Sequence, residues 1–306
     1  MNVLSTLQGM FIRILIIFMF AVSVLESSGQ TVILGVLEDF PGSPPEYPGH
    51  RSVRVVFRKN EHDWQSYFNA CSARDCRNKT ATDYPVEMRW TITFDGRNLG
   101  QLSSHMSKQL EFDSSKGEQQ IASEGSVPTI GNRLSEFGTF LNDTAYRPLV
   151  AVSQPYFKDP DMWKRTHLSA DMATLAFRDF HKKLPKLCKT DAKSESGVSP
   201  FPYRNTDLKT GKVYASKAGW LLIELKIDAI ECDDESGRSI DNQWFVITPT
   251  REVHFLGEGM WLVDAGDYDN DGKSEVMFCI DQYNRGGYKL FYDDFKKQTI
   301  FEFHYH

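Results

Sequence analysis

Short hydrophobic runs separated by Gly, Asp or Asn fill the chain from Ala218 to its end. Runs of this length and spacing are typical of β-strands in an antiparallel sandwich, barrel or propeller. The predicted strands are Trp220–Ile230, Gln243–Thr248, Arg251–Leu256, Met260–Val263, Glu275–Ile280, Tyr288–Tyr292 and Thr299–Tyr305. In the last of them aromatic residues alternate with polar ones, which places the two kinds on opposite faces of a strand. The C-terminal third is therefore predicted to be antiparallel β structure.

The N-terminal half shows the same pattern at three places. The segments Thr31–Leu37 and Ser52–Arg58 have the composition of strands, and a loop rich in Pro and Gly separates them. Hydrophobic residues then alternate with polar ones over 88–94, and Asp95-Gly96 follows immediately. Because Asp-Gly favours a tight turn between paired strands, this pattern predicts a β-hairpin. Residues 113–127 are polar and are predicted to form a loop.

One segment has the periodicity of a helix. From Ser169 to Leu184 the hydrophobic residues recur every three or four positions and form one stripe. Lys182 and Lys183 suit the last turn of a helix, and Pro185 ends it. The predicted fold class is therefore mainly β, with antiparallel strands in a propeller-like or sandwich arrangement and one main helix near 169–184.

The polar stretch 189–212 is predicted to be a loop or linker and is the best candidate for a domain boundary. It would separate a β-rich region, residues 30–188, that ends in the helix from a C-terminal β region, residues 213–306. The alternative is that the two regions form one domain.

The N-terminus has the pattern of a signal peptide. Arg13 is followed by an uncharged apolar run of about 12 residues, Ile14–Leu25, and then by small residues around Gly29. Such a run is short for a membrane helix, which needs roughly 20 residues, but it suits a signal peptide. We expect residues 1–29 to be removed; an uncleaved hydrophobic anchor is the alternative. No second long apolar run follows, so no membrane span is expected after cleavage, and the protein is predicted to be secreted or periplasmic.

Export changes how the five cysteines are interpreted, because thiols tend to pair in an oxidising compartment. Cys71 and Cys76 are close enough in sequence for a tight turn to bridge them. Cys188 and Cys232 flank a polar stretch and the strand that follows it. Cys279 lies in a continuous apolar run, where a buried thiol behaves as a small hydrophobic group. The predicted pairs are Cys71–Cys76 and Cys188–Cys232, with Cys279 left as a thiol.

The composition allows a hydrophobic core and argues against one class of partner. Hydrophobic residues make up 41% of the chain, which is ordinary for a globular protein. The net charge is −6, whereas a nucleic-acid surface needs clustered Lys and Arg. No nucleic-acid partner is therefore expected.

An acidic loop, Asp267–Glu275 (DYDNDGKSE), separates two of the predicted strands. Carboxylates stand at its positions one, three, five and nine, which are Asp267, Asp269, Asp271 and Glu275. Gly272 permits a sharp turn, and Lys273 can offer its backbone carbonyl. Calcium takes six to eight oxygen ligands in a flexible shell, and a bound ion would remove the repulsion among these carboxylates. The loop is therefore predicted to bind Ca²⁺; the alternative is a solvated acidic turn.

The flanks of the loop exclude an EF-hand. That motif needs a Glu at position twelve and a helix on each side, whereas position twelve here is Phe278 and both flanks are predicted strands. The segment DAGDYDNDGKSEVMF, from Asp264 to Phe278, instead resembles the calcium loop of FG-GAP/VCBS repeats, the blade units of integrin α-type β-propellers. The resemblance spans residues 260–292, and one clear copy is present. It implies a calcium loop within a propeller-like blade, with Glu275 where that family usually has Asp.

None of the common catalytic motifs is present, including G-x-S-x-G, HExxH and Walker A. We therefore expect an exported β-rich protein with a structural calcium site and a binding or scaffolding role toward an unknown protein or glycan. One alternative is a secreted hydrolase whose catalytic residues are scattered in the sequence. The other is a glycan-binding module that uses exposed aromatic residues such as Tyr283, Tyr288 or Tyr292.

Overall fold

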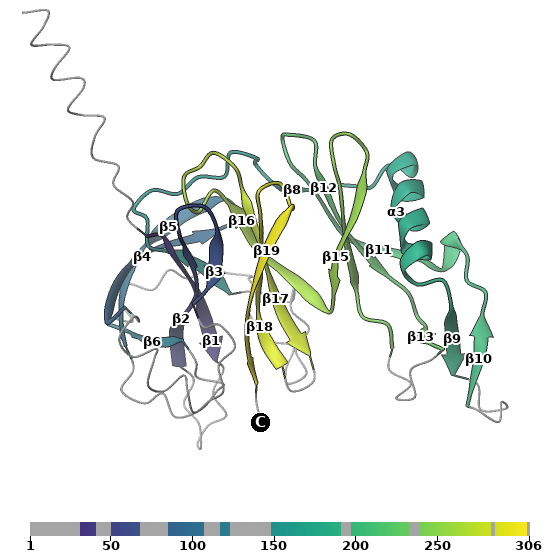
Figure 1. The fold of residues 1–306 in the computed structure, drawn as a ribbon, viewed down its shortest axis with the longest axis horizontal. Coiled ribbons are helices and arrows are strands. Elements are labelled where there is room, and N and C mark those ends of the chain that lie inside the picture. Colours follow the sequence, from purple (N-terminus) through teal and green to yellow (C-terminus); the bar gives the residue numbers. More distant parts are fainter. Residues whose placement is uncertain are drawn as a thin grey trace, which may run out of the picture.

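The computed structural model describes residues 31–40, 50–67, 85–106, 117–122, 148–190, 197–232, 239–282 and 285–304. The predicted signal peptide, the Cys71–Cys76 pair and Tyr283 lie outside these ranges. In the described part, antiparallel sheets and one α-helix follow one another along the longest axis of the molecule (Figure 1). The prediction of a mainly β, antiparallel fold with one main helix is confirmed.

Six strands close into a barrel, which lies at one end of the molecule (Figure 1). They are β1 (Ile33–Phe40), β2 (His50–Lys59), β4 (Glu87–Phe94), β5 (Arg97–Met106), β6 (Glu118–Ile121) and β7 (Leu149–Val152), with the short β3 (Trp64–Ser66) paired to β2. The predicted strands at 31–37, 52–58 and 88–94 correspond to β1, β2 and β4. Asp95 and Gly96 join β4 to β5 with φ angles of 49° and 68°, the left-handed conformation that a two-residue hairpin turn requires.

β6 lies within 113–127, where the sequence predicts a loop. Its Gln119 side chain is fully buried, accepts a hydrogen bond from the Ser104 hydroxyl at 2.6 Å and donates one to the Pro85 carbonyl at 2.6 Å. Because this strand buries an amide where a hydrophobic side chain would be expected, it lacks the alternation that marks a strand in sequence. The barrel therefore closes through a strand that the hydrophobic pattern does not reveal.

A sheet of four consecutive strands, here called the C-terminal sheet, packs against the barrel. It consists of β16 (Met260–Gly266), β17 (Glu275–Gln282), β18 (Arg285–Tyr292) and β19 (Lys297–His304). Met277 and Leu290 belong to the core shared with the barrel, whereas Val276 and Phe278 belong to the core on the opposite face. The continuous apolar run of β17 thus reflects a strand that is covered on both faces.

A five-stranded sheet covers that opposite face. Its strands are β15 (Val253–Glu258), β14 (Gln243–Ile247), β12 (Leu221–Lys226), β11 (Lys209–Ala215) and β8 (Lys164–Arg165), in this order. Its far face packs against helix α3 (Ala170–Lys183), which buries Ala176 and Phe180. The helix begins after Ser169 and ends before Leu184, so the helix predicted from the hydrophobic stripe is confirmed.

A three-stranded sheet beside the helix completes the fold. It contains β9 (Leu187–Thr190), β10 (Val198–Phe201) and β13 (Ile230–Glu231), and a 3₁₀ turn, η3 (Asn205–Asp207), follows β10. The prediction that 189–212 is a loop is therefore wrong for the end of β9, for β10 and for the start of β11. β10 is a short edge strand with an exposed Pro200, and it becomes a strand through its pairing with β9. The strands predicted after Ala218 are all present, with the first divided into β12 and β13.

Candidate metal centre

The acidic loop connects β16 to β17 at one end of the C-terminal sheet and curls back on itself. Asn270 and Gly272 adopt left-handed φ angles of 62° and 92°. Asp267 Oδ2 accepts a hydrogen bond from the Gly272 amide at 3.0 Å, and Asp269 Oδ1 accepts one from the Asp271 amide at 3.1 Å. These contacts fold the loop so that side chains from both of its ends can meet.

Asp267, Asp269 and Glu275 converge in this fold. One carboxylate oxygen from each lies within 4.8 Å of the others. Asp267 is fully buried and Glu275 is 2% exposed, and Asp267 Oδ1 has no hydrogen-bond partner among the described residues. A buried carboxylate oxygen without a donor is costly, so its environment favours either a proton or a cation. The three residues, here called the acidic triad, form the candidate metal centre.

The raised pKa values of two carboxyl groups in the triad also favour a proton or a cation at this position. Burial, followed by the neighbouring charges of Asp269 and Asp271, raises the pKa of Asp267 to about 6, although the Gly272 amide opposes this shift. Burial, followed by the charge of Asp269, raises the pKa of Glu275 well above its ordinary value. A divalent cation at this point would supply the missing positive charge and hold both groups ionised.

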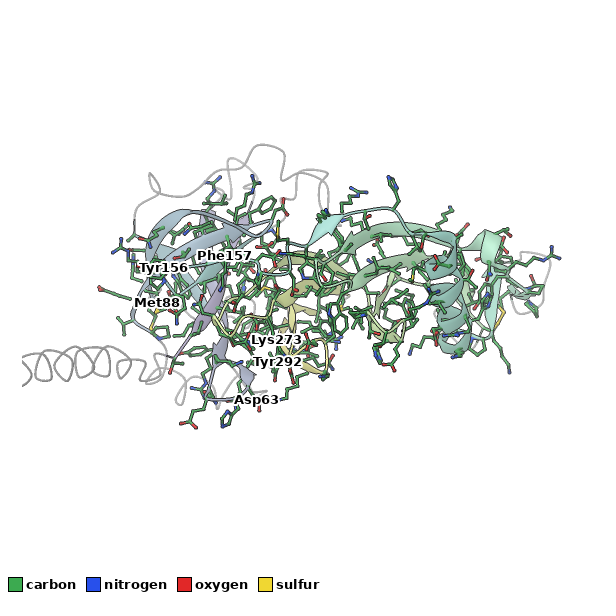
Figure 2. The ribbon with its side chains drawn as sticks, turned by 90° about the horizontal axis from the view of Figure 1, so that it is seen from above. Asp63, Met88, Tyr156, Phe157, Lys273 and Tyr292 are labelled. Atoms are coloured by element: carbon green, nitrogen blue, oxygen red, sulfur yellow. A yellow bond between two sulfur atoms is a disulfide. The ribbon has the colours of Figure 1, made fainter. Side chains whose placement is uncertain are left out.

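The start of the loop is fixed by the segment that follows the barrel. The Asp267 amide donates to the Lys158 carbonyl at 3.0 Å, and the Phe157 and Tyr268 rings stack at 5.6 Å (Figure 2 labels Phe157). A Cβ atom on Gly266 would lie 2.2 Å from the Phe157 ring, so only glycine fits there. Packing therefore sets the position of Asp267 before any ion binds.

Two further contacts hold the second half of the loop. The Ser274 hydroxyl donates to Asp159 Oδ1 at 2.7 Å. The Lys273 ammonium donates to Asp293 at 2.9 Å and to Asp294 at 3.0 Å, in the turn that follows Tyr292, and Figure 2 labels Lys273 and Tyr292 in this region. The loop is thus tied both to the connection from the barrel and to the β18–β19 turn.

The structure brings together three of the predicted ligands. Asp271 is exposed and outside the acidic triad, and its Oδ1 accepts a hydrogen bond from the Lys273 amide at 2.8 Å. A role of the Lys273 carbonyl as a ligand stays a prediction. No sequence pattern indicated Lys59, whose ammonium nitrogen lies 2.6 Å from Asp269 Oδ2. Asp159 and Asp161 were not singled out either, although both accept hydrogen bonds from Ser274. Their Asp-x-Asp spacing is the one signal in the sequence that could have indicated them.

The cysteines in the described part behave largely as predicted. Cys188 and Cys232 form a disulfide, with Cα atoms 4.9 Å apart, which confirms this pair. Cys279 remains a thiol and is half-buried. The disulfide ties β9 to the residue after β13.

Two of the tyrosines proposed as an exposed glycan-binding surface are in fact buried. Tyr288 is 4% exposed and Tyr292 is 7% exposed, since both belong to the core between the barrel and the C-terminal sheet. The sequence of β18 does not reveal this burial. The strand is covered on both faces, so hydrophobic and polar residues do not alternate along it in the way that marks one buried face. A stacking surface built on these two rings is therefore ruled out.

Comparisons with known proteins identify no relative. No family model matches the chain, and no curated protein and no solved structure matches it. None of the helices in the described residues is long and apolar enough to cross a membrane. Any functional assignment therefore rests on the chain's own geometry.

Proposed function

We propose that this chain is an exported β protein in which the loop 267–275 holds a structural calcium ion, and that it acts by binding or scaffolding. The observation that carries the proposal is the buried Asp267 Oδ1, which lies in the acidic triad without a donor among the described residues. All the side-chain ligands are carboxylate oxygens, which suit a hard cation, and calcium tolerates the irregular geometry of a loop better than magnesium does.

The surrounding sheet supports the resemblance to FG-GAP/VCBS repeats. The C-terminal sheet has four strands in sequential order, and the acidic loop joins the first to the second. A four-stranded antiparallel sheet is also the blade unit of a propeller. The barrel packs on one face of the C-terminal sheet and the five-stranded sheet packs on the other, where the neighbouring blades of a propeller would pack. We therefore infer that the C-terminal sheet is a single calcium-binding unit of this kind.

The Cys188–Cys232 disulfide supports export. Disulfides form and persist in oxidising compartments and are rare in the cytosol. Secretion or a periplasmic location agrees with the predicted signal peptide. The partner of such a protein would be another protein or a glycan. A secreted hydrolase is the rival function, and it requires turnover that a single Asp, Glu or His substitution outside 264–275 abolishes.

Thermal unfolding with and without calcium tests the calcium proposal. An ion that binds only the folded state at a hundredfold excess over its dissociation constant stabilises it by about 2.7 kcal/mol. Asp267→Asn removes the buried charge, so this variant should melt higher than the parent chain in chelator and should lose most of the stabilisation by calcium. Asp228→Asn, at an exposed position outside the loop, is the matched control and should keep that stabilisation. An equal response of Asp267→Asn and the parent chain to calcium would refute the proposal.

A further inference from the structure

Two lysines bring positive charge to the acidic triad. The Lys59 ammonium nitrogen lies 2.6 Å from Asp269 Oδ2, and the Lys158 ammonium nitrogen lies 3.9 Å from Asp267 Oδ2. Lys59 belongs to β2 of the barrel, and Lys158 belongs to the segment that leads from β7 to β8. The negative charge of the triad is therefore partly balanced by side chains from outside the acidic loop.

The two lysines differ in how firmly they are held. The Lys158 side chain is 64% exposed, so it can turn into solvent at little cost. The Lys59 side chain is 17% exposed, and its ammonium group lies over the rings of Trp64 and Tyr292. A cation over the faces of two aromatic rings is attracted by both of them. Lys59 is therefore the cation that the fold holds at the triad.

The two oxygens of Asp269 have different roles. Oδ1 accepts the hydrogen bond from the Asp271 amide that shapes the loop, whereas Oδ2 faces Lys59. Oδ2 is therefore the oxygen whose partner can change while the loop keeps its turn. A calcium ion on this oxygen would stand close to the Lys59 ammonium, and the two positive charges would repel strongly because the Asp269 side chain is only 4% exposed. The ion and the ammonium group thus compete for one carboxylate.

The ion pair between Lys59 and Asp269 lies where the barrel meets the C-terminal sheet. Lys59 is the last residue of β2, and the chain after it leads to Asp63, which accepts a hydrogen bond from the Lys297 ammonium of β19 at 2.6 Å. The Tyr292 hydroxyl at the end of β18 also points to Asp63, and Figure 2 labels both residues in this region. The ion pair is thus one of several contacts that join the β2–β3 hairpin to the C-terminal sheet and its loops.

We propose that calcium binding at the acidic triad takes Asp269 Oδ2 from Lys59 and releases the lysine side chain to solvent, so that calcium controls a contact between the barrel and the C-terminal sheet. This inference rests on the proposed calcium site, for which the buried Asp267 Oδ1 is the independent observation. Residues 60–62, which follow Lys59, are exposed, so the released side chain has solvent beside it. The coupling is reciprocal, because whatever holds Lys59 on Asp269 weakens calcium binding by the same factor.

The exchange also sets the calcium concentration at which the site fills. Calcium finds Asp269 available only in the fraction of molecules in which Lys59 has moved away, and the apparent dissociation constant rises by the inverse of that fraction. Calcium binding that is about tenfold weaker than without the lysine corresponds to a pairing of Lys59 with Asp269 in about nine molecules of ten. Lys59 thus acts as a regulator of the calcium site and is not one of its ligands.

Chemical labelling of lysine amines in the full chain, read for each residue by mass spectrometry, tests the release of Lys59. Saturating calcium should raise the labelling rate of Lys59 about tenfold over that in chelator, because the released fraction rises from about one in ten to nearly all. Lys182, which pairs with Asp179 on α3, is the internal control and should be labelled equally in both. Calorimetry on the same sample separates two failures. An absence of calcium binding would refute the proposed function, whereas calcium binding with an unchanged Lys59 rate would overturn the exchange alone.

Three variants distinguish the held ammonium from positive charge in general. Lys59→Gln should bind calcium about tenfold more tightly than the parent chain, whereas Lys59→Arg keeps the charge and should stay within about threefold of the parent chain. Lys158→Gln removes the more exposed lysine and should change the calcium affinity by at most about threefold, because a mostly exposed ion pair contributes little. Melting curves in chelator check that each variant folds. Equal tightening in Lys59→Gln and in either of the other two variants would overturn the exchange.

Discussion

The ammonium nitrogen of Lys59 in β2 lies 2.6 Å from Asp269 Oδ2 in the acidic loop, although the two residues come from different sheets. The lysine side chain is only 17% exposed, and its nitrogen lies 5.5 Å from the centre of the Trp64 ring and 5.6 Å from that of the Tyr292 ring. Lys59 thus places a positive charge beside a carboxylate that we propose as a calcium ligand. A calcium ion at the acidic triad would have to compete with this tethered cation.

Lys59→Gln should therefore raise calcium affinity and lower stability in chelator. We expect calcium to bind about tenfold more tightly, because the substitution removes a positive charge next to the ion. We expect the calcium-free chain to lose roughly 1 kcal/mol of stability, because the ion pair between Lys59 and Asp269 is lost. Isothermal titration calorimetry and chemical denaturation measure the two effects. Lys297→Gln is the matched control, because Lys297 pairs with Asp63 at 2.6 Å and makes no ion pair with the loop in the described residues. Weaker calcium binding in Lys59→Gln would contradict the competition.

The stability of the calcium-free chain should depend on pH through Asp267. Its pKa is raised to about 6 in the folded state, so the folded chain holds a proton that the unfolded chain releases at lower pH. The contribution of Asp267 to the free energy of unfolding is therefore fully present below about pH 4 and is lost as the pH rises through about 6. Glu275 shifts in the same direction.

Melting curves in chelator between pH 4 and 7 check this dependence. The loss of stability across this range should be smaller in Asp267→Asn than in the parent chain, because only the latter has the titrating group. Saturating calcium should also reduce the loss, since the ion takes the place of the proton. Parallel pH profiles for the two chains in chelator would show that Asp267 is not protonated in the fold.

The contacts of Lys273 should stabilise the β18–β19 turn whether or not calcium is bound. Asp293, Asp294 and Phe295 have consecutive left-handed φ angles of 50°, 57° and 61°. Each residue in this conformation costs roughly 1–2 kcal/mol. The Lys273 ammonium holds Asp293 and Asp294 in place through its two hydrogen bonds. The same hydrogen bonds raise the pKa of Lys273.

Lys273→Met should lower stability by about 1 kcal/mol in calcium and in chelator alike, because both partners are partly exposed. Lys296→Met is the control from the same turn and should have little effect. Denaturant titrations of both variants measure the difference. A loss confined to the calcium-bound state would indicate that Lys273 acts through the ion instead.

Reduction of the Cys188–Cys232 disulfide should destabilise the chain. The bond closes a loop with a sequence separation of 44, and the entropy of such a loop corresponds to at most about 4 kcal/mol. The double variant Cys188→Ala/Cys232→Ala should melt lower than the oxidised parent chain. It should also respond less to reductant than the parent chain does. An equal response to reductant in both would assign the effect to another pair, such as Cys71–Cys76.

Features encoded within a few neighbouring residues could be predicted from the sequence alone. The stripe from Ser169 to Leu184 specified α3, and Asp95-Gly96 specified the β4–β5 turn. The spacing of Asp267, Asp269 and Glu275 indicated which carboxylates could meet, because a loop with a glycine turn has few ways to fold. In each case the pattern and the contact that it predicts lie within one element or one loop.

Only the tertiary structure decided how distant segments combine. Gln119 completes the barrel through polar contacts with Ser104 and Pro85 that no hydrophobic period signals. Tyr288 is exposed only in the glycan-binding alternative; it is in fact buried, because β18 packs against the barrel, whose strands come from the other end of the chain. The pairing of Lys59 with Asp269 likewise depends on how the barrel packs against the C-terminal sheet. Local chemistry determines the conformation of a short segment, whereas the partner of a side chain across two sheets depends on the path of all the chain between them.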